Sequence, residues 1–412
     1  MNAVFDATRT QLPRTRQACA GDLLSHSLKV TPETCNQDVQ NTFAQNKSLI
    51  SLPVVEAGRA IGLINRNIFM SHVSKPFHRE IYGKKSCIAF MDKEPLQADE
   101  AMSIEELTFR AVASGEKAFA DGFIITNEHG DYLGMGRGMD LMSQVADIQA
   151  EKNRQILHSI DYASVIQRAM LRQSQSVLEE AFRDAYMIWE PRDVVGGDFY
   201  HFCRYNNGWF AAIADCTGHG VPGAFMTMIA SSCLTQALEI YGPENPAQLL
   251  ACVNGSIKSL LGQFPDAATR PESDEGLDAG FIWFNSDSKT LTYAGAKTSL
   301  FYITPDEDQV QTLDGVRMGV GYIDSPEDFQ WKNSELKTPD DTLFFITTDG
   351  LIDQIGDAKK IAFGKRHIRD TLHLCKQQTT KEICQSLLAQ FNSWQGSEPR
   401  RDDLTFFCFR SH

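Results

Sequence analysis

The run over residues 139–182 contains neither Gly nor Pro, and it constrains the architecture of this 412-residue chain more than any other feature. Apolar residues recur in it at steps of mostly three and four, the spacing of one face of an α-helix. They are Leu141, Val145, Ile148, Ile156, Ile160, Ala163, Ile166 and Met170. A long helix with one apolar stripe predicts a helical connector between two globular parts and a coiled-coil homodimer. The alternative is a helix that lies along its own domain, because polar residues within 149–154 interrupt the seam.

The N-terminal side of this helix carries an internal repeat. Two strand-like segments joined by a Gly-containing turn occur twice, each followed by the start of a helical pattern. The first copy comprises Leu52–Val55, Gly58, Ile61–Leu63 and Ile68–Met70, and the second comprises Phe123–Thr126, Gly130, Leu133–Met135 and Asp140–Met142. We therefore predict a two-copy α/β unit over residues 46–142. Residues 1–45 are polar and weakly periodic, which predicts a loose segment with one helix as an option.

The repeat resembles a pair of CBS modules, which act as sensing or dimerising units. That resemblance implies an adenine nucleotide as ligand, held at the ribose by an Asp early in the closing helix. Asp140 stands at that position in the second copy, whereas Ile68 stands there in the first. Arg66 and Arg137 are candidates for contact with a phosphate, or else two exposed arginines. A purely structural or dimerising module is the alternative.

The C-terminal side, residues 183–412, mixes short strands with helices. Strand-like segments often come in adjacent pairs, whereas the helical stretches fall mostly in two blocks, which predicts a layered α+β fold. The expected strands are 210–215, 281–284, 291–294, 300–303, 343–347 and 404–409, and the expected helices are 223–240, 246–262, 364–375 and 380–395. Residues 263–278 are rich in Pro, Asp, Glu and Ser, which predicts a surface loop.

Charge and cysteine usage narrow the class of protein. The net charge of −14 argues against a nucleic-acid binder or an anionic-membrane binder, because both need clustered Lys and Arg. The ten cysteines form no C-x-x-C pair, which predicts reduced thiols in a cytoplasmic protein. The N-terminus lacks the apolar stretch of a signal peptide, and no apolar run approaches the length that spans a bilayer.

Four short acidic motifs in the C-terminal part carry the chemistry. Each places an Asp in a short turn beside strand-like residues, and oxygen ligands of this kind suit Mg²⁺ or Mn²⁺. The motifs are Gly196–Tyr200, Asp215–Gly220, Thr348–Gly350 and Asp402–Thr405. Asp215 falls at the end of an apolar strand and before three glycines that permit a sharp turn. A carboxylate at such a junction can direct both oxygens to one place and bridge two cations.

In their order and residue sequence, the four motifs resemble those of the metal-dependent Ser/Thr protein phosphatases, in the bacterial SpoIIE-type branch. Over about residues 160–410 this resemblance implies a layered α-β-β-α domain with two Mn²⁺ or Mg²⁺ ions. It implies Asp215 as the bridging ligand, and the short turn Ala294-Gly295-Ala296 is similar to one in the family. The implied metal ligands are Asp198, Asp215, the Cys216 backbone carbonyl, Asp349, Asp402 and, as its neighbour, Asp403, and the catalytic set is Asp198, Asp215, Asp349 and Asp402.

The resemblance also implies a function. We expect a phosphoserine/phosphothreonine protein phosphatase of bacterial signalling, in which two cations polarise a water for attack on phosphorus. Phosphorylated anti-sigma-factor antagonists, which are small STAS-domain proteins, are the implied substrate class. Further candidates have more than one possible role. His219 is either a proton donor or a turn residue, and Arg192 is either a phosphate contact or a surface arginine. Asp278 is a candidate for an extra metal ligand, and Asp353 and Asp357 are expected to be turn residues.

Other functions fit the sequence less well. Gly196–Phe199 invites comparison with the Gly-Gly-Asp-Glu-Phe hairpin of cyclic-dinucleotide cyclases, but the Glu is missing. No Cys has an Arg six positions later, which excludes a cysteine-dependent phosphatase, and no G-x-x-x-x-G-K-[ST] loop is present. The open alternative is a non-catalytic, nucleotide-sensing regulator that uses a phosphatase-like domain for binding. An Asp at all four motif positions argues against it.

Overall fold

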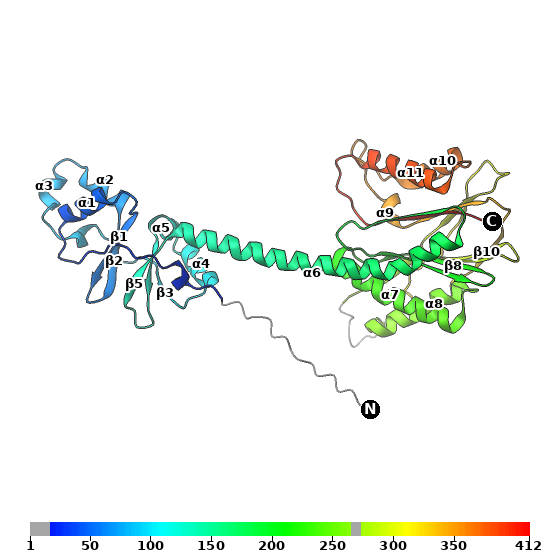
Figure 1. The fold of residues 1–412 in the computed structure, drawn as a ribbon, viewed down its shortest axis with the longest axis horizontal. Helices are drawn as coiled ribbons and strands as arrows, with labels where there is room; N and C mark the ends of the chain where they lie inside the picture. The colour runs from blue at the N-terminus through cyan, green and yellow to red at the C-terminus, as the bar shows by residue number, and fades with distance from the viewer. Residues whose placement is uncertain (1–16, 265–272) are drawn as a thin grey trace, which may run out of the picture. The chain divides into compact units, whose positions relative to one another are not determined.

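The computed structural model describes residues 17–264 and 273–412, and the internal contacts divide the chain into two units, Met1–Gln155 and Ile156–His412 (Figure 1). Helix α6, Gly138–Ala181, crosses the division. The helix predicted over 139–182 is therefore confirmed to within a residue at each end.

The N-terminal unit contains a two-stranded sheet, β1-β2, and a three-stranded sheet, β3-β4-β5. The β1–β2 hairpin turns at Ala57 and Gly58, which both have positive φ, as the tightest hairpin turns require. The elements of this unit are η1 (Ala20–Leu23), α1 (Asn36–Gln45), β1 (Ser51–Glu56), β2 (Arg59–Asn65), α2 (Arg66–Val73), α3 (His78–Tyr82), η2 (Cys87–Phe90), β3 (Gln97–Asp99), α4 (Ile104–Ala113), α5 (Glu116–Asp121), β4 (Phe123–Thr126) and β5 (Tyr132–Gly136).

The predicted repeat is present as two strand-turn-strand-helix units. β1 and β2 lead into α2, and β4 and β5 lead into α6, with antiparallel pairing in both copies. Leu63 from the first copy packs with Ile124 and Met135 from the second, so the two copies share an apolar contact. The identification of these copies as CBS modules stays a prediction.

The expectation of a loose N-terminal segment is wrong for residues 17–45. Val39 and Phe43 lie four positions apart on α1 and are fully buried in the same cluster as Phe69. Val30 pairs with Val54 of β1 and donates its backbone N–H to the carbonyl of Pro53. A few apolar residues in a polar stretch are thus enough to fix the segment. Residues 1–16 of the predicted segment lie outside the described residues.

The C-terminal unit is built on two five-stranded antiparallel sheets, with strand orders β13-β10-β9-β8-β7 and β12-β11-β14-β15-β6. Its elements after α6 are β6 (Ala185–Glu190), β7 (Asp198–Tyr205), β8 (Gly208–Cys216), α7 (Gly220–Tyr241), α8 (Pro246–Leu261), β9 (Leu277–Asn285), β10 (Thr290–Ala296), β11 (Leu300–Ile303), β12 (Gln311–Leu313), β13 (Ser334–Lys337), β14 (Leu343–Thr347), α9 (Asp349–Ile352), α10 (Gly364–Leu374), α11 (Thr380–Gln395) and β15 (Leu404–Arg410).

The layers follow the alternation of side chains along each strand. Phe344 and Ile346 of β14 enter the large core shared with the first sheet, whereas Leu343 and Phe345 enter the core beneath the last helices. Figure 1 shows α7 and α8 on one side of the sheets and α10 and α11 on the other. The predicted layered α+β fold, helices outside and sheets inside, is confirmed for this unit.

One helix corrects the expectation about apolar runs. α7 is long and apolar enough to cross a membrane by length and composition alone. Half of its most apolar window is buried inside the protein, and Ala230, Leu234 and Ala237 are fully buried in the main core. This burial is the pattern of a core helix, which shares its composition with a membrane span.

Candidate metal centre

The four predicted aspartates come from the two sheets in pairs. Asp198 at the start of β7 lies directly opposite Asp215 near the end of β8. Asp349 begins α9 immediately after β14, and Asp402 precedes β15, the neighbour of β14. The facing edges of both sheets therefore deliver carboxylates to one region, although the motifs are far apart in the sequence.

The carboxyl groups interact strongly with one another. Burial, and then the charge of Asp403, raises the pKa of Asp198 well above its ordinary value. Burial, and then the charges of Asp198 and Asp349, does the same to the pKa of Asp215. Asp349 keeps exposed surface, yet partial burial of its carboxyl group and the charge of Asp402 raise its pKa to about 6. The aspartates are thus close enough for each to oppose ionisation of the others.

Asp198 is held by groups from neighbouring elements. The Thr348 hydroxyl donates to Asp198 Oδ2 at 2.8 Å, which favours the charged carboxylate. The Trp189 indole N–H donates to the Asp198 backbone carbonyl at 2.9 Å. With 1% of its surface exposed, Asp198 cannot rely on water for these hydrogen bonds. Its carboxylate is therefore fixed in place from the second sheet.

Asp403 anchors the loop that leads into β7. Its Oδ1 accepts the Arg192 backbone N–H at 2.6 Å, and its Oδ2 accepts the Gly197 N–H at 2.5 Å. The Asp198 N–H makes a longer contact of 3.4 Å with Oδ2. Because backbone amides occupy both oxygens, this geometry favours a positioning role for Asp403 over the predicted ligation.

Two glycines are needed for the close approach of these loops. A Cβ on Gly197 would lie 2.4 Å from the Gly218 carbonyl oxygen, and a Cβ on Gly350 would lie 1.9 Å from that of Asp403. The Cys216 backbone joins the same contact, since its N–H donates to the Gly197 carbonyl at 3.0 Å. Burial raises the pKa of the Cys216 thiol, which leaves its backbone carbonyl as the candidate ligand.

The donor set fits divalent cations by charge. No Lys or Arg in the described parts of the chain forms an ion pair with Asp198, Asp215, Asp349 or Asp402, which leaves this negative charge without a protein counter-ion. Within residues 17–264 and 273–412, no three His, Cys, Asp or Glu side chains form a ready-made metal site. The carboxylates are therefore neighbours that a cation would draw together, and ligation stays a prediction.

A cavity of about 210 Å³ opens beside the aspartates and brings in two lysines that the sequence analysis missed. Asp215, Asp278 and Asp349 line it together with Lys297 and Lys365. The Lys297 ammonium lies 3.2 Å from Asp278 Oδ1, so this carboxylate has its own counter-ion and is disfavoured as an extra metal ligand. Lys297 directly follows Ala294-Gly295-Ala296, which form the end of strand β10 and not the expected turn. This position was the local signal available in the sequence.

The remaining acidic and basic candidates have structural partners. His219 Nδ1 lies 2.9 Å from Asp193 Oδ2, which supports the turn role over the proton donor. The Arg192 guanidinium donates to the Arg401 carbonyl at 3.0 Å. Asp353 lines the cavity beside the aspartates, and Asp357 accepts the Ser397 hydroxyl at 2.7 Å. Arg192 and His219 thus stabilise the loops around the centre.

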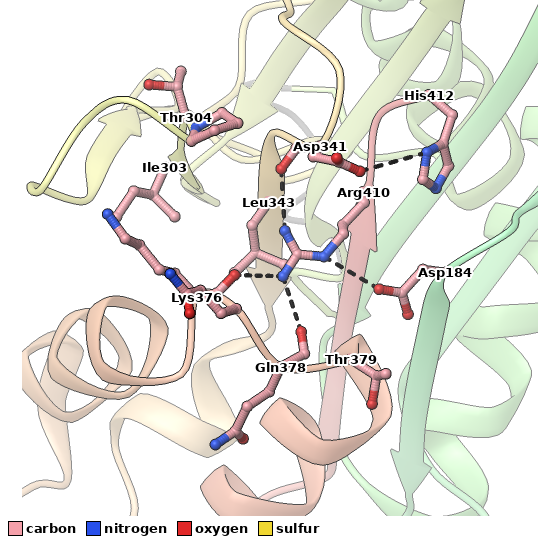
Figure 2. A pocket seen from close by; sticks show the side chains of 12 residues that line it. Asp184, Ile303, Thr304, Asp341, Leu343, Lys376, Gln378, Thr379, Arg410 and His412 are labelled. Atoms are coloured by element: carbon pink, nitrogen blue, oxygen red, sulfur yellow. Dashed lines mark hydrogen bonds and ion pairs between the residues drawn. The ribbon is translucent and has the colours of Figure 1, made fainter.

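A larger cavity of about 460 Å³ lies at the opposite ends of β14 and β15 from Asp349 and Asp402 (Figure 2). The Arg410 guanidinium crosses it and donates to Asp184 at 3.2 Å and to three backbone carbonyls. Figure 2 shows these contacts around the arginine, which leave it committed to the protein. The Arg410 guanidinium is therefore not available to a ligand in this cavity.

A cavity of about 400 Å³ in the N-terminal unit contains two of the residues predicted there. Asp121, Arg137 and Asp140 contribute to its wall. Arg66 has a different use, because its guanidinium donates to the carbonyls of Asn46, Lys47, Leu49 and Phe43. The expectation of a phosphate contact is therefore wrong for Arg66, and Arg137 with Asp140 remain candidates.

Comparisons with known proteins agree with the C-terminal architecture. Residues 205–412 match the family described as stage II sporulation protein E (SpoIIE). The chain is similar to the SiaA-PP2C domain of Pseudomonas aeruginosa, at 36% identity and TM-score 0.55, over 63% of this chain and 99% of that one. Curated proteins returned no match.

Two further solved structures are similar to the chain at a lower level. One comprises the PP2C phosphatase domain and a regulatory fragment of SpoIIE from Bacillus subtilis, at 18% identity and TM-score 0.44, over 55% of this chain and 62% of that one. The other is RsbX in complex with magnesium, at 19% identity and TM-score 0.38, over 55% of this chain and 94% of that one.

Proposed function

The chain belongs to the SpoIIE family of bacterial serine phosphatases, and we propose that it is a metal-dependent phosphoserine/phosphothreonine protein phosphatase. One observation carries the proposal: two sheets bring Asp198, Asp215, Asp349 and Asp402 together without a counter-ion. Carboxylates in this arrangement are stabilised by divalent cations, and phosphate esters are a substrate class that such cations serve.

The residues would divide the work as follows. A pair of Mn²⁺ or Mg²⁺ ions would supply a water of lowered pKa and compensate the charge on phosphorus. Asp198, Asp215, Asp349 and Asp402, with the Cys216 carbonyl, would hold the ions. The Thr348 hydroxyl favours the charged form of Asp198 and orients its carboxylate, and Asp403 fixes the loop that carries Asp198.

The direct test is hydrolysis by the full chain with Mn²⁺. We expect release of phosphate from p-nitrophenyl phosphate and from a phosphoserine peptide, and a loss of at least about 100-fold in Asp215→Asn and Asp349→Asn. Asp357→Asn, which alters a carboxylate bound to Ser397 in another region, is the matched control. Binding of the phosphopeptide without hydrolysis would instead support the non-catalytic regulator.

For the natural substrate we propose a phosphorylated anti-sigma-factor antagonist of the STAS class, on the basis of family membership. The test is loss of phosphate from such a protein, phosphorylated on serine by its kinase, measured as a shift on a phosphate-affinity gel. Persistence of the phosphoprotein, while a generic phosphoserine peptide is hydrolysed, would reject this substrate class and leave the activity in place.

We further propose that α6 passes a signal from the N-terminal unit to the metal centre. The Gln167 side chain donates to the Gly196 carbonyl at 2.7 Å and accepts the Gly196 N–H at 3.2 Å, so the helix holds the loop before Asp198. Leu171 and Leu178 of α6 pack in the core of the C-terminal unit. This part of the helix therefore lies along its own domain, which was the alternative to a pure connector. Gln167→Ala should change activity and leave the thermal midpoint within a few degrees.

The same helix supports the proposal of a homodimer. Leu141, Val145 and Ile148 of the stripe predicted for the coiled coil pack in the N-terminal core. Further along the stripe, Ile156, Ile166 and Met170 have 58%, 39% and 36% of their surface exposed. Light scattering should give the mass of a dimer for the full chain and of a monomer for the Ile156→Glu/Ile166→Glu variant. A monomeric wild type would reject the proposal.

For the N-terminal unit we propose a CBS-like sensor that takes an adenine nucleotide, in a cytoplasmic protein with no membrane or nucleic-acid partner. The wall of its cavity supplies Arg137 for a phosphate and Asp140 for a ribose. Calorimetry of the full chain with AMP and ATP tests this, with Asp140→Ala as the variant and Asp131→Ala as the control. Equal heats for wild type and Asp140→Ala would reject the assignment.

A further inference from the structure

We propose that a groove beside the metal centre binds an acidic segment of the protein substrate, an inference that rests on the proposed phosphatase function. The groove has a volume of about 800 Å³ and lies within the C-terminal unit. One wall is α6, and the other is the end of β6 with the segment that follows it. Its lining includes Arg168, Leu171, Arg172, Trp189, Tyr200 and Arg400.

Two arginines on the helix wall have no acidic partner. Arg168 and Arg172 are exposed, stand one turn apart on α6, and form no ion pair within the described residues. The third arginine of the groove is neutralised, because Arg400 lies 3.0 Å from Glu190. The groove thus presents two free guanidinium groups on a chain with a net charge of −14.

The floor of the groove is apolar. Leu171 and Tyr200 are each 7% exposed, and Trp189 lies beside them in the lining. Free guanidinium groups favour carboxylates through paired hydrogen bonds, and an apolar floor accepts the aliphatic or aromatic side chains of a peptide. This combination fits an acidic protein segment that also carries an apolar residue.

Hydrogen bonds connect the walls of the groove to the segment that carries Asp198. Trp189 in its floor donates its indole N–H to the Asp198 carbonyl at 2.9 Å. Gln167, the neighbour of Arg168, is bonded to Gly196 in the loop before Asp198. A substrate segment seated in the groove would therefore lie next to the loop that carries a catalytic aspartate, which places the acidic residues near the phosphoserine.

The rim favours a protein over a nucleic acid. Glu190 and Asp193 are part of the lining and pair with Arg400 and Arg192, so the rim lacks the continuous positive charge that a row of phosphates needs. A peptide needs only to place carboxylates at the two free arginines. A second copy of this chain is the competing occupant, because α6 also carries the exposed apolar stripe.

The test uses two phosphoserine peptides that differ only in their flanking residues, Asp and Glu in one and Asn and Gln in the other. With wild type and Mn²⁺ we expect the acidic peptide to have a kcat/KM about tenfold higher, mostly through a lower KM. Arg168→Glu/Arg172→Glu should reduce that preference to below about twofold. It should leave hydrolysis of p-nitrophenyl phosphate within about twofold of wild type, since that substrate is too small to reach the groove.

The matched control is Arg204→Glu, an exposed arginine on β7 near the hairpin end, away from Asp198. It should keep the wild-type preference. An unchanged preference for the acidic peptide in the double variant would overturn the proposal. If the double variant also changed its oligomeric mass by light scattering while it kept that preference, the groove would be assigned to contact between copies.

Binding separates this proposal from the proposed function. Fluorescence anisotropy with the acidic peptide requires no turnover, and we expect wild type to bind it about tenfold more tightly than the double variant does, with the difference shrinking in high salt. Wild type that binds the acidic peptide but hydrolyses neither substrate would reject the phosphatase and keep the groove. Equal binding of both peptides would reject the groove.

Discussion

The ammonium of Lys297 lies 3.2 Å from Oδ1 of Asp278, which itself pairs across the sheet with Asp215. Lys297 has a φ of +57°, unusual for a residue with a side chain, and its ammonium also lies 4.5 Å from the centre of the Tyr322 ring. Lys297 thus provides a positive charge at the edge of the cluster of carboxylates.

Removal of this charge should strengthen metal binding. In Lys297→Met, the cluster loses a nearby positive charge and Asp278 becomes a free carboxylate. Because Lys297 is half exposed, we expect a modest effect, about tenfold in the Kd for Mn²⁺ by calorimetry. Lys289→Met, which removes a similar ion pair with Asp340 elsewhere, is the control. Unchanged or weaker Mn²⁺ binding would show that Lys297 does not act on the centre.

Metal binding should depend on pH near 6. The pKa of Asp349 is raised to about 6, so below that pH a proton occupies the carboxyl group that a cation needs. The Kd for Mn²⁺ should therefore increase as the pH falls through 6, by about tenfold per pH unit for one competing proton. Calorimetry between pH 5 and 7.5 measures this. Asp349→Asn should bind Mn²⁺ more weakly at pH 7 and lose the step at pH 6.

Thr348→Val should weaken the centre without disturbing its shape. The substitution removes the hydroxyl that donates to Asp198, and the pKa of Asp198 then rises further because its charged form loses a hydrogen bond. A hydrogen bond to a charged group contributes about 1.5–3 kcal/mol, so the Kd for Mn²⁺ should increase at least about tenfold at pH 7. Thr235→Val, on the exposed side of α7, should leave the Kd unchanged.

Adjacent aspartates should behave in opposite ways. Asp403→Asn puts an amide group against backbone N–H groups that need acceptors, so urea unfolding should show a loss of about 2–3 kcal/mol in the free energy of unfolding. Asp402→Asn removes a repelling charge and should keep that free energy while it lowers Mn²⁺ affinity. Equal effects of the two substitutions on stability and on metal binding would contradict the division of roles.

Much of the C-terminal fold follows from local sequence. The strand around Phe344 is an apolar run shortly before Asp349, and the strand around Phe406 is an apolar run directly after Asp403. Such runs have few alternatives to a buried strand. β7 was missed because Asp198, His201 and Arg204 break its apolar pattern. In the fold, burial of Phe199 and Phe202 stabilises β7 as a strand. This burial depends on tertiary packing, which the local sequence does not reveal.

The metal centre was only partly predictable. The four motifs identified the aspartates, because an Asp at or beside one end of a strand is a local feature. The partners of those aspartates come from distant segments, so nothing near Asp403 in the sequence reveals that it accepts the N–H groups of Arg192 and Gly197. The same reason hid Lys297, whose contact with Asp278 depends on the register of β9 and β10.

Each β-sheet supplies two of the four carboxylates, so an ion held by all four would link the two sheets. Binding to the native state alone would then add to conformational stability, by about 2.7 kcal/mol when the free cation is at 100 times its Kd. The melting temperature of this domain should consequently rise with the concentration of divalent ions, and a chelator should lower it.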